Sequence, residues 1–222
     1  MTQAAPDSAP DPDAWARETE DRVLDAALAH VAHEGWTRRL AIRAGADVGL
    51  SAGETELLLP NGAADLAALL ARRHDRRALA VLAATDPASL KIRERIRLAV
   101  EARLDAAAQD EAAVRRWSGF LALPQNLALG GRLLWDSADH LWRWAGDTAT
   151  DENHYSKRAI LSGILSAALA LRLHSGREAS MAFVDARIAN VMSFEKWKAT
   201  TKIRPSLALK GLAETLGRMR YG

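Results

Sequence analysis

Apolar residues along this chain fall mostly at helical spacing, and no alternating apolar–polar stretch is long enough to predict a strand. Between Pro12 and Pro205 only three prolines interrupt the chain, and each lies where a periodic segment ends. Two capping boxes, Ser51–Glu54 and Ser175–Glu178, and an N-cap at Asp86 mark further helix starts. The pattern predicts an all-α protein with helices at Asp13–Glu34, Arg38–Ala46, Ala52–Leu59, Ala63–Ala84, Pro87–Gln109, Glu111–Leu123, Asn126–Ala145, Asp151–His174, Arg177–Thr200 and Pro205–Arg220.

The first three predicted helices run long, short, short before a long connecting helix, which is the layout of a helix-turn-helix head on a helical body. The segments 22–28 and 34–36 resemble the opening of TetR-type repressors, and 42–51 resembles their turn. We therefore expect a TetR-like fold of about nine helices plus a C-terminal amphipathic helix. The predicted divisions are a disordered N-terminus (1–12), a degenerate helix-turn-helix head (13–62), a helical ligand-binding body (63–200) and a tail (201–222).

The charge of the head argues against DNA as its partner. Residues 13–62 hold nine acidic and five basic residues, a net charge of −4. The predicted recognition helix, Ala52–Leu59, carries two glutamates and none of the Arg, Lys, Asn or Gln side chains that read base edges. A ligand-responsive transcriptional regulator of TetR type is therefore kept as the alternative function, with no DNA binding as the main expectation.

The tail has the opposite charge. Residues 196–222 hold seven basic residues and one acid, a net charge of +6. A basic amphipathic helix of this kind suits an anionic membrane surface, and docking on the body or in a dimer is the alternative. The predicted membrane-binding residues are an apolar stripe and its flanking cations: Leu209, Leu212, Leu216, Met219, Lys210, Arg218 and Arg220.

Several kinds of chemistry are absent from the sequence. The chain has no cysteine, which excludes thiol nucleophiles, cysteine-based metal sites and disulfides. It has no Glu-x-x-His, phosphate-binding loop or Gly-x-Ser-x-Gly motif, so we expect a non-catalytic protein without cofactor or metal, with a lipid-dependent enzyme as a rival. The longest uncharged run, Ala159–Leu171, is shorter than the roughly 20 residues of a bilayer helix and predicts a core helix packed nearly all round.

Polar and aromatic residues gather where the helix over Asn126–Ala145 ends and the next helix begins. Gly146 is predicted to end the first helix, and Asp147 or Asp151 to cap the second. Trp, Tyr and Arg are frequent at binding hot spots, although the same residues could merely cap and staple two helices. The candidate partner-binding residues are Trp142, Asp147, Asp151, Asn153, Tyr155 and Arg158.

This stretch resembles a known family. The pattern Leu-Pro-x-Asn from Leu123, followed by Asp-x-x-Trp-x-x-Ala-Gly-Asp-x-x-x-Asp-x-Asn-x-Tyr-x-x-Arg-Ala from Asp139, is similar to the accessory lipid-binding family of coenzyme Q biosynthesis, the Coq-nine family. The resemblance runs from about Arg22 to Phe194. His154 stands where eukaryotic members have Trp, and Leu165 where an aromatic is common.

The resemblance implies a non-enzymatic protein of ubiquinone biosynthesis that has a TetR-like fold. It would bind a polyprenylated quinone intermediate, or a phospholipid, and present the quinone to the di-iron demethoxyubiquinone hydroxylase docked at the corner described above. The resemblance also favours membrane binding over docking on the body as the role of the tail, and it is compatible with a homodimer. Because the sequence shows no transit peptide, it implies a bacterial member of the family, located on the cytoplasmic side of the inner membrane. The candidate lipid-lining residues, each of which could be ordinary core, are Trp117, Phe120, Leu121, Leu127, Leu134, Ile164, Leu165, Met181 and Phe183.

Overall fold

The structure is a computed structural model that describes residues 12–148 and 152–201, and all regular structure within them is helical. The all-α prediction is confirmed, and the arrangement is consistent with a TetR-like fold. The elements are α1 (Pro12–Glu34), α2 (Arg38–Asp47), α3 (Ala52–Leu58), α4 (Ala63–Leu82), the short 3-10 helix η1 (Pro87–Ser89), α5 (Ile92–Ala108), α6 (Glu111–Leu121), the 3-10 helix η2 (Pro124–Asn126), α7 (Leu127–Trp144) and α8 (Glu152–Thr201). The predicted N-terminal segment and tail helix lie outside the described residues.

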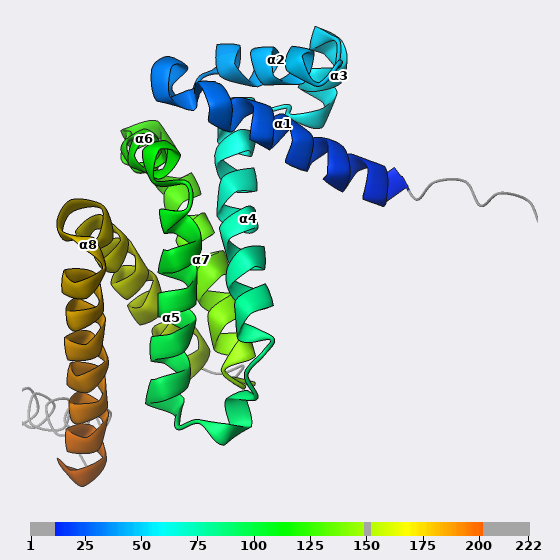
Figure 1. Cartoon of the computed structure of the whole chain (residues 1–222). Coiled ribbons are helices and arrows are strands. Elements are labelled where there is room, and N and C mark those ends of the chain that lie inside the picture. The colour runs from blue at the N-terminus through cyan, green and yellow to red at the C-terminus, as the bar shows by residue number, and fades with distance from the viewer. Residues whose placement is uncertain (1–11, 149–151, 202–222) are drawn as a thin grey trace, which may run out of the picture.

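Helices α1–α3 form a head at one end of the molecule, and α4 leads from it into a body of α4, α5, α7 and α8 (Figure 1). The expected capping box begins α3: the Ser51 hydroxyl accepts from the Glu54 amide at 3.2 Å, and the Glu54 carboxylate accepts from the Ser51 amide at 2.8 Å. Helices α2 and α3 approach so closely that a Cβ at Gly45 would lie 2.0 Å from Oγ1 of Thr55. The close packing of α2 on α3 within the head therefore requires glycine at position 45.

The predicted boundaries of the first four helices and of the helix over 111–123 lie within two residues of the observed ones, but the predicted helix start at Pro87 was wrong. Asp86 caps the 3-10 helix at Pro87 instead of a long helix, and α5 begins only at Ile92, where Glu94 accepts a hydrogen bond from the Lys91 amide at 2.9 Å. Helix α6 ends at Leu121 because Pro124 favours an extended conformation at the residue before it.

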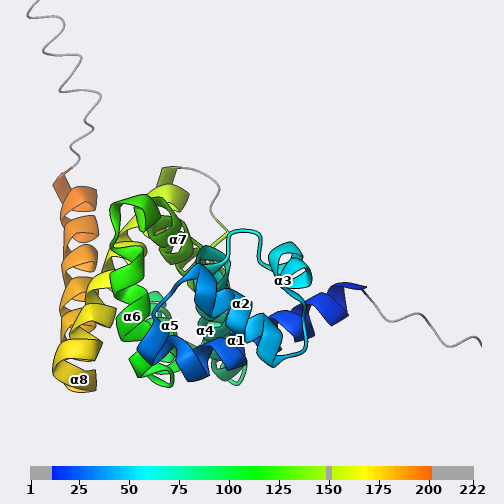
Figure 2. The same cartoon turned by 90° about the horizontal axis from the view of Figure 1, so that it is seen from above.

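Helix α8 is assigned as one element, but Gly176 inside it is not helical (φ 84°, ψ −174°). The chain turns back at this point, as Figure 1 shows, so the predicted break between His174 and Arg177 is confirmed. The second half of α8 lies at the edge of the body (Figure 2). Among its side chains described up to residue 191, it buries a thin stripe that comprises Ser180, Met181 and Val184. Two ion pairs, Arg97–Asp185 and Arg177–Glu101, join it to α5.

The apolar run Ala159–Leu171 is not packed all round, so that prediction was wrong. Leu161, Ile164 and Ala168 are buried, whereas Ile160 is 45% exposed. By length and composition the segment His154–Val191 could cross a membrane. Of its most apolar window 22% is buried inside the protein, and the turn at Gly176 divides the segment. In the structure one face of each half packs on the body and the opposite face is open.

A band of polar residues crosses the middle of α4 between two apolar clusters. Arg103 of α5 pairs with the buried carboxylate of Asp75 at 2.5 Å, and Ser137 of α7 donates to the same oxygen at 2.7 Å. Next to them, His74 is 1% exposed and lies 2.9 Å from the Asp110 carboxylate. Burial, with smaller contributions from nearby arginines, lowers the pKa of His74 to about 4 even though Asp110 opposes the shift.

The low pKa of His74 predicts an acid-sensitive contribution to stability. As the pH falls from about 6.5 to about 4, the unfolded chain binds a proton at this position before the folded chain does, so the free energy of unfolding should fall by up to about 3 kcal/mol. Urea denaturation of the wild type and of His74→Gln across this window measures the effect as a difference. The pKa of His140 is raised by Asp75, which acts in the opposite direction, but it is present in both proteins. A pH-independent difference would contradict the prediction.

Candidate functional site

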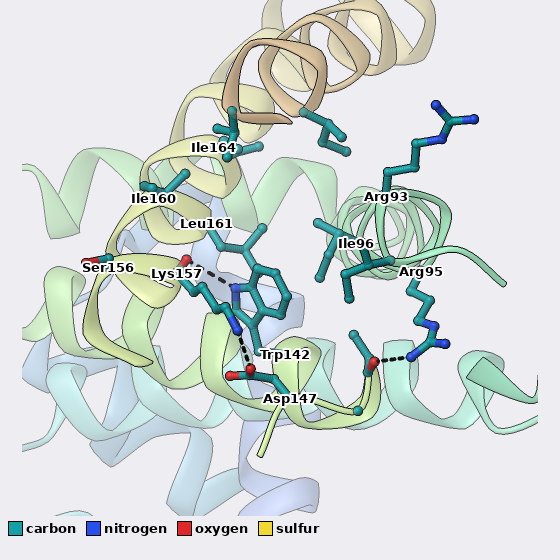
Figure 3. A pocket seen from close by; sticks show the side chains of 15 residues that line it. Arg93, Arg95, Ile96, Trp142, Asp147, Ser156, Lys157, Ile160, Leu161 and Ile164 are labelled. Atoms are coloured by element: carbon teal, nitrogen blue, oxygen red, sulfur yellow. Dashed lines mark hydrogen bonds and ion pairs between the residues drawn. The ribbon is translucent and has the colours of Figure 1, made fainter. Parts of the chain in front are cut away.

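A cavity of about 560 Å³ lies between the start of α5, the end of α7 and both halves of α8. Its size is typical of small-molecule sites. Five of its fifteen lining residues are isoleucines, contributed by α5 and by both halves of α8; Figure 3 labels Ile96 on α5 and Ile160 and Ile164 on α8. The lining residues are Ile92, Arg93, Arg95, Ile96, Trp142, Ala145, Gly146, Asp147, Ser156, Lys157, Ile160, Leu161, Ile164, Ile188 and Val191.

The end of α7 places the polar residues of this cavity. Gly146 adopts φ 89°, which permits two closing hydrogen bonds: its amide donates to the Arg143 carbonyl at 3.0 Å, and the Asp147 amide donates to the Trp142 carbonyl at 3.0 Å. The predicted helix end at Gly146 is thereby confirmed. Arg95 of α5 donates to the carbonyl of Ala145 at 2.8 Å, which ties the two helices together.

A buried ion-pair cluster joins the end of α7 to α8. Asp147 accepts from Lys157 Nζ at 2.6 Å and from Arg158 Nη1 at 2.9 Å, and Arg158 Nε donates to Asp139 at 2.6 Å. Burial opposes ionisation of Asp147, but the hydrogen bonds from Lys157 and Arg158 outweigh it and lower the pKa of its carboxyl below the ordinary value. Trp142 Nε1 donates to the Lys157 carbonyl at 3.1 Å, and Lys157 Nζ lies 5.3 Å from the centroid of the Trp142 ring.

The outer surface of the same corner is aromatic. Tyr155 is 64% exposed, and its ring centroid lies 6.1 Å from that of Trp135 on α7 and 5.2 Å from that of His154. The corner therefore has two sides: the cavity with its ion pairs inside, and an exposed tyrosine outside.

The six candidate partner-binding residues divide between these two sides. Tyr155 faces solvent, Trp142 lines the cavity, and Asp147 pairs with Arg158. We expected Arg158 to face a partner together with Asp151, but Arg158 is 1% exposed, since two carboxylates neutralise it inside the corner. Asp147 pairs with α8 side chains rather than capping the helix. The side chains of Asp151 and Asn153 lie outside the described residues.

The candidate lipid-lining residues do not form one surface. Ile164 alone among them lines the large cavity, and it borders a smaller groove together with Phe183. Leu127 is 59% exposed at the start of α7. The others belong to apolar cores: Trp117, Phe120 and Leu121 to the core beside the head, and Leu134, Leu165 and Met181 to the core of the body. Their role in lipid binding stays a prediction.

Most of the cavity wall was not identified from the sequence. Ile92 and Ile96 are four residues apart on α5, and Ile188 and Val191 are three apart on α8, so both pairs share a helix face. That spacing is the available signal, but it is equally typical of core. The predicted membrane-binding residues of the tail lie outside the described residues, and within the described part of the chain no cluster of acidic and histidine side chains could hold a metal ion.

A helix-turn-helix-like head, a helical body and an apolar cavity define a TetR-like protein with room for a small ligand. The COQ9 family model matches residues 127–195, which contain α7 and most of α8. Three relatives named ubiquinone biosynthesis protein COQ9, mitochondrial, are similar to this chain over most of its length. The Rattus norvegicus protein is 27% identical over 88% of this chain and 65% of its own length, the Bos taurus protein 26% over 88% and 64%, and the Xenopus tropicalis protein 28% over 90% and 67%.

These matches confirm the resemblance to the COQ9 family that was expected from the sequence. It spans about two thirds of the length of these curated relatives.

Proposed function

We propose that this protein is a non-catalytic, lipid-binding accessory protein of ubiquinone biosynthesis. The observation that carries the proposal is the isoleucine-lined cavity of about 560 Å³, most of whose wall lies within the region similar to COQ9. A polyprenylated quinone intermediate is nearly insoluble in water, so its transfer to a partner requires an apolar site that lowers the cost of leaving the bilayer. The cavity supplies such a site.

The proposed recipient of the lipid is the di-iron demethoxyubiquinone hydroxylase, docked at the outer surface of the α7–α8 corner. Tyr155 supports this assignment, because an exposed aromatic with a hydroxyl group is a frequent interface anchor. The cavity lies directly behind this corner, with Lys157 only two residues from Tyr155. Docking there would bring the partner next to the bound lipid.

A ligand-responsive transcriptional regulator is the alternative, and the head argues against it. All three arginines of α2 pair with acidic side chains: Arg38 with Glu56, and Arg39 and Arg43 with Glu34. The exposed face of α3 presents Glu54 and Glu56. A surface of this charge repels phosphates instead of binding them. Sequence-specific binding in a gel-shift assay would favour the regulator.

We expect polyprenylated quinones to co-purify with the protein and to be found by mass spectrometry of its lipid extract. Ile160→Glu should lower the amount by roughly tenfold or more, since it places a carboxylate in the cavity wall where Ile160 is already 45% exposed and the fold can tolerate it. Val81→Glu, at an aliphatic residue of α4 that is 66% exposed and outside the cavity, is the matched control and should retain the lipid. Equal lipid contents in the two variants would exclude this cavity as the site.

The tail is proposed to bind the protein to an anionic membrane, at the cytoplasmic face of a bacterial inner membrane. The seven basic residues of the segment 196–222 should each contribute up to ~1 kcal/mol near such a surface, and residues 205–222 hold three of them together with the apolar stripe. Deleting residues 205–222 should leave a folded protein that floats much less with liposomes containing phosphatidylglycerol. Undiminished flotation of the shortened chain would show that the affinity comes from elsewhere, with the open face of α8 as the next surface to test.

A further inference from the structure

The cavity has two chemically different ends. At the end where α7 meets α8, an indole and two cations face the space: Trp142, Lys157 and Arg95. At the other end, where the two halves of α8 face each other, the wall is mostly aliphatic and comprises Ile164, Ile188 and Val191; the third lining cation, Arg93 of α5, points away from Arg95 in Figure 3. Figure 3 shows the indole of Trp142 toward the interior between Lys157 and Ile96, with Ile164 farther along α8.

The polar end carries excess positive charge. Asp147 neutralises Lys157 and is shared with Arg158. Arg95 donates to the carbonyls of Leu90 and Ala145, and no ion pair among the described residues involves it. Oxygen acceptors of a ligand are therefore favoured at this end, and the face of the indole offers a flat apolar surface beside them.

The length of the cavity limits what it can hold. From Lys157 to Ile164 the helix rises about 10 Å, at about 1.5 Å per residue. An aromatic ring and the first few isoprenyl units fill that length and the volume of about 560 Å³, whereas a complete polyprenyl chain does not fit. The remainder of the chain must leave the cavity on the aliphatic side.

We propose that the cavity binds its ligand in one orientation. The oxygen-bearing aromatic ring lies against Trp142 at the α7–α8 corner, and the isoprenyl chain runs past Ile164 and leaves between the two halves of α8. The assignment rests on the proposed function, because it takes a prenylated ring as the ligand. To the proposed function it adds two assignments: the subsite that binds the aromatic ring, and the side of the cavity on which the isoprenyl chain leaves.

Two probes of equal chain length test the ring subsite: a ubiquinone with two isoprenyl units, and geraniol, which has the same two units and no ring. Calorimetry should show that the wild type binds the ubiquinone more tightly than geraniol. Trp142→Leu keeps apolar area but loses the indole, so it should reduce this preference by about three- to tenfold. Trp135→Leu, at the aromatic on the outer surface, should leave the preference unchanged.

The outcomes separate the proposals. An unchanged preference in Trp142→Leu overturns the orientation while binding itself still supports the proposed function. If the wild type binds neither probe, the proposed function fails and the orientation fails with it. Because both probes are compared within one variant, a loss of folded protein affects them equally.

The aliphatic end has its own test. Ile188→Ala should weaken both probes by a similar factor, since both carry the chain. A selective loss of the ubiquinone in Ile188→Ala would place the ring at the opposite end and overturn the orientation. A third probe, short-chain phosphatidylglycerol, distinguishes the ring from a phosphate head group. If Trp142→Leu weakens binding of phosphatidylglycerol as much as binding of the ubiquinone, the polar end binds acceptor oxygens whether or not they are carried by a ring. That result would also overturn the assignment.

Discussion

Arg158→Ala should cost about 3–5 kcal/mol of folding free energy, because it leaves two carboxylates without their shared cation. The side chain of Arg158 is 2% exposed and that of Asp147 5%, so water cannot replace the lost contacts cheaply. The variant should melt at a markedly lower temperature, and in denaturant titrations it should unfold at a lower midpoint.

Arg143→Ala is the matched control for this prediction. Arg143 also pairs with Asp139, at 2.6 Å, but its side chain is 69% exposed, so its loss should cost less than about 1 kcal/mol. Tyr155→Ala provides the complementary case: it should keep nearly full stability and lose hydroxylase binding in a pull-down. Wild-type stability of Arg158→Ala, with binding lost, would instead restore Arg158 as a direct partner contact.

Trp117→Ala should destabilise the protein by about 3–5 kcal/mol, as expected for a large aromatic removed from a core. Trp117 is 5% exposed and donates from Nε1 to the Ala67 carbonyl at 2.9 Å, which joins α6 to α4 beside the head. Chemical denaturation measures the loss, and Leu127→Ala on the exposed start of α7 is a control with a small expected effect. A stable Trp117→Ala protein that has lost its lipid would support the sequence-based assignment of Trp117 to the lipid site.

The helices were predictable because their signals are local. The capping residues Ser51 and Glu54, the closing Gly146 and the break near Gly176 act within a few residues of themselves. The errors arose where two local signals compete. At Asp86–Pro87 the sequence can start either a short 3-10 helix or an α-helix, and Glu94 decides by capping the amide of Lys91.

The candidate site was predictable only in part, because its geometry depends on contacts between distant segments. The sequence marks the α7–α8 corner correctly as unusual, but it does not say that Arg158 points inward, since that depends on Asp139 nineteen residues away. The cavity is harder still. Its isoleucines on α5 and α8 have the same spacing as core residues, and only the relative placement of three helices leaves a space between them.

The turn at Gly176 gives the cavity one wall that is separable from the rest. The other walls belong to α5, α7 and the first half of α8. Ile188 and Val191 lie on the second half of α8, which, among its side chains described up to residue 191, buries only Ser180, Met181 and Val184 and is otherwise joined to α5 by ion pairs at its surface. Weakly anchored segments of this kind open locally at less free-energy cost than the whole domain. The volume of the cavity therefore depends on how often the second half of α8 opens, and it is not fixed by the fold alone. Any molecule that fills it shifts the local opening equilibrium toward the closed form, and salt that screens the surface ion pairs shifts it back.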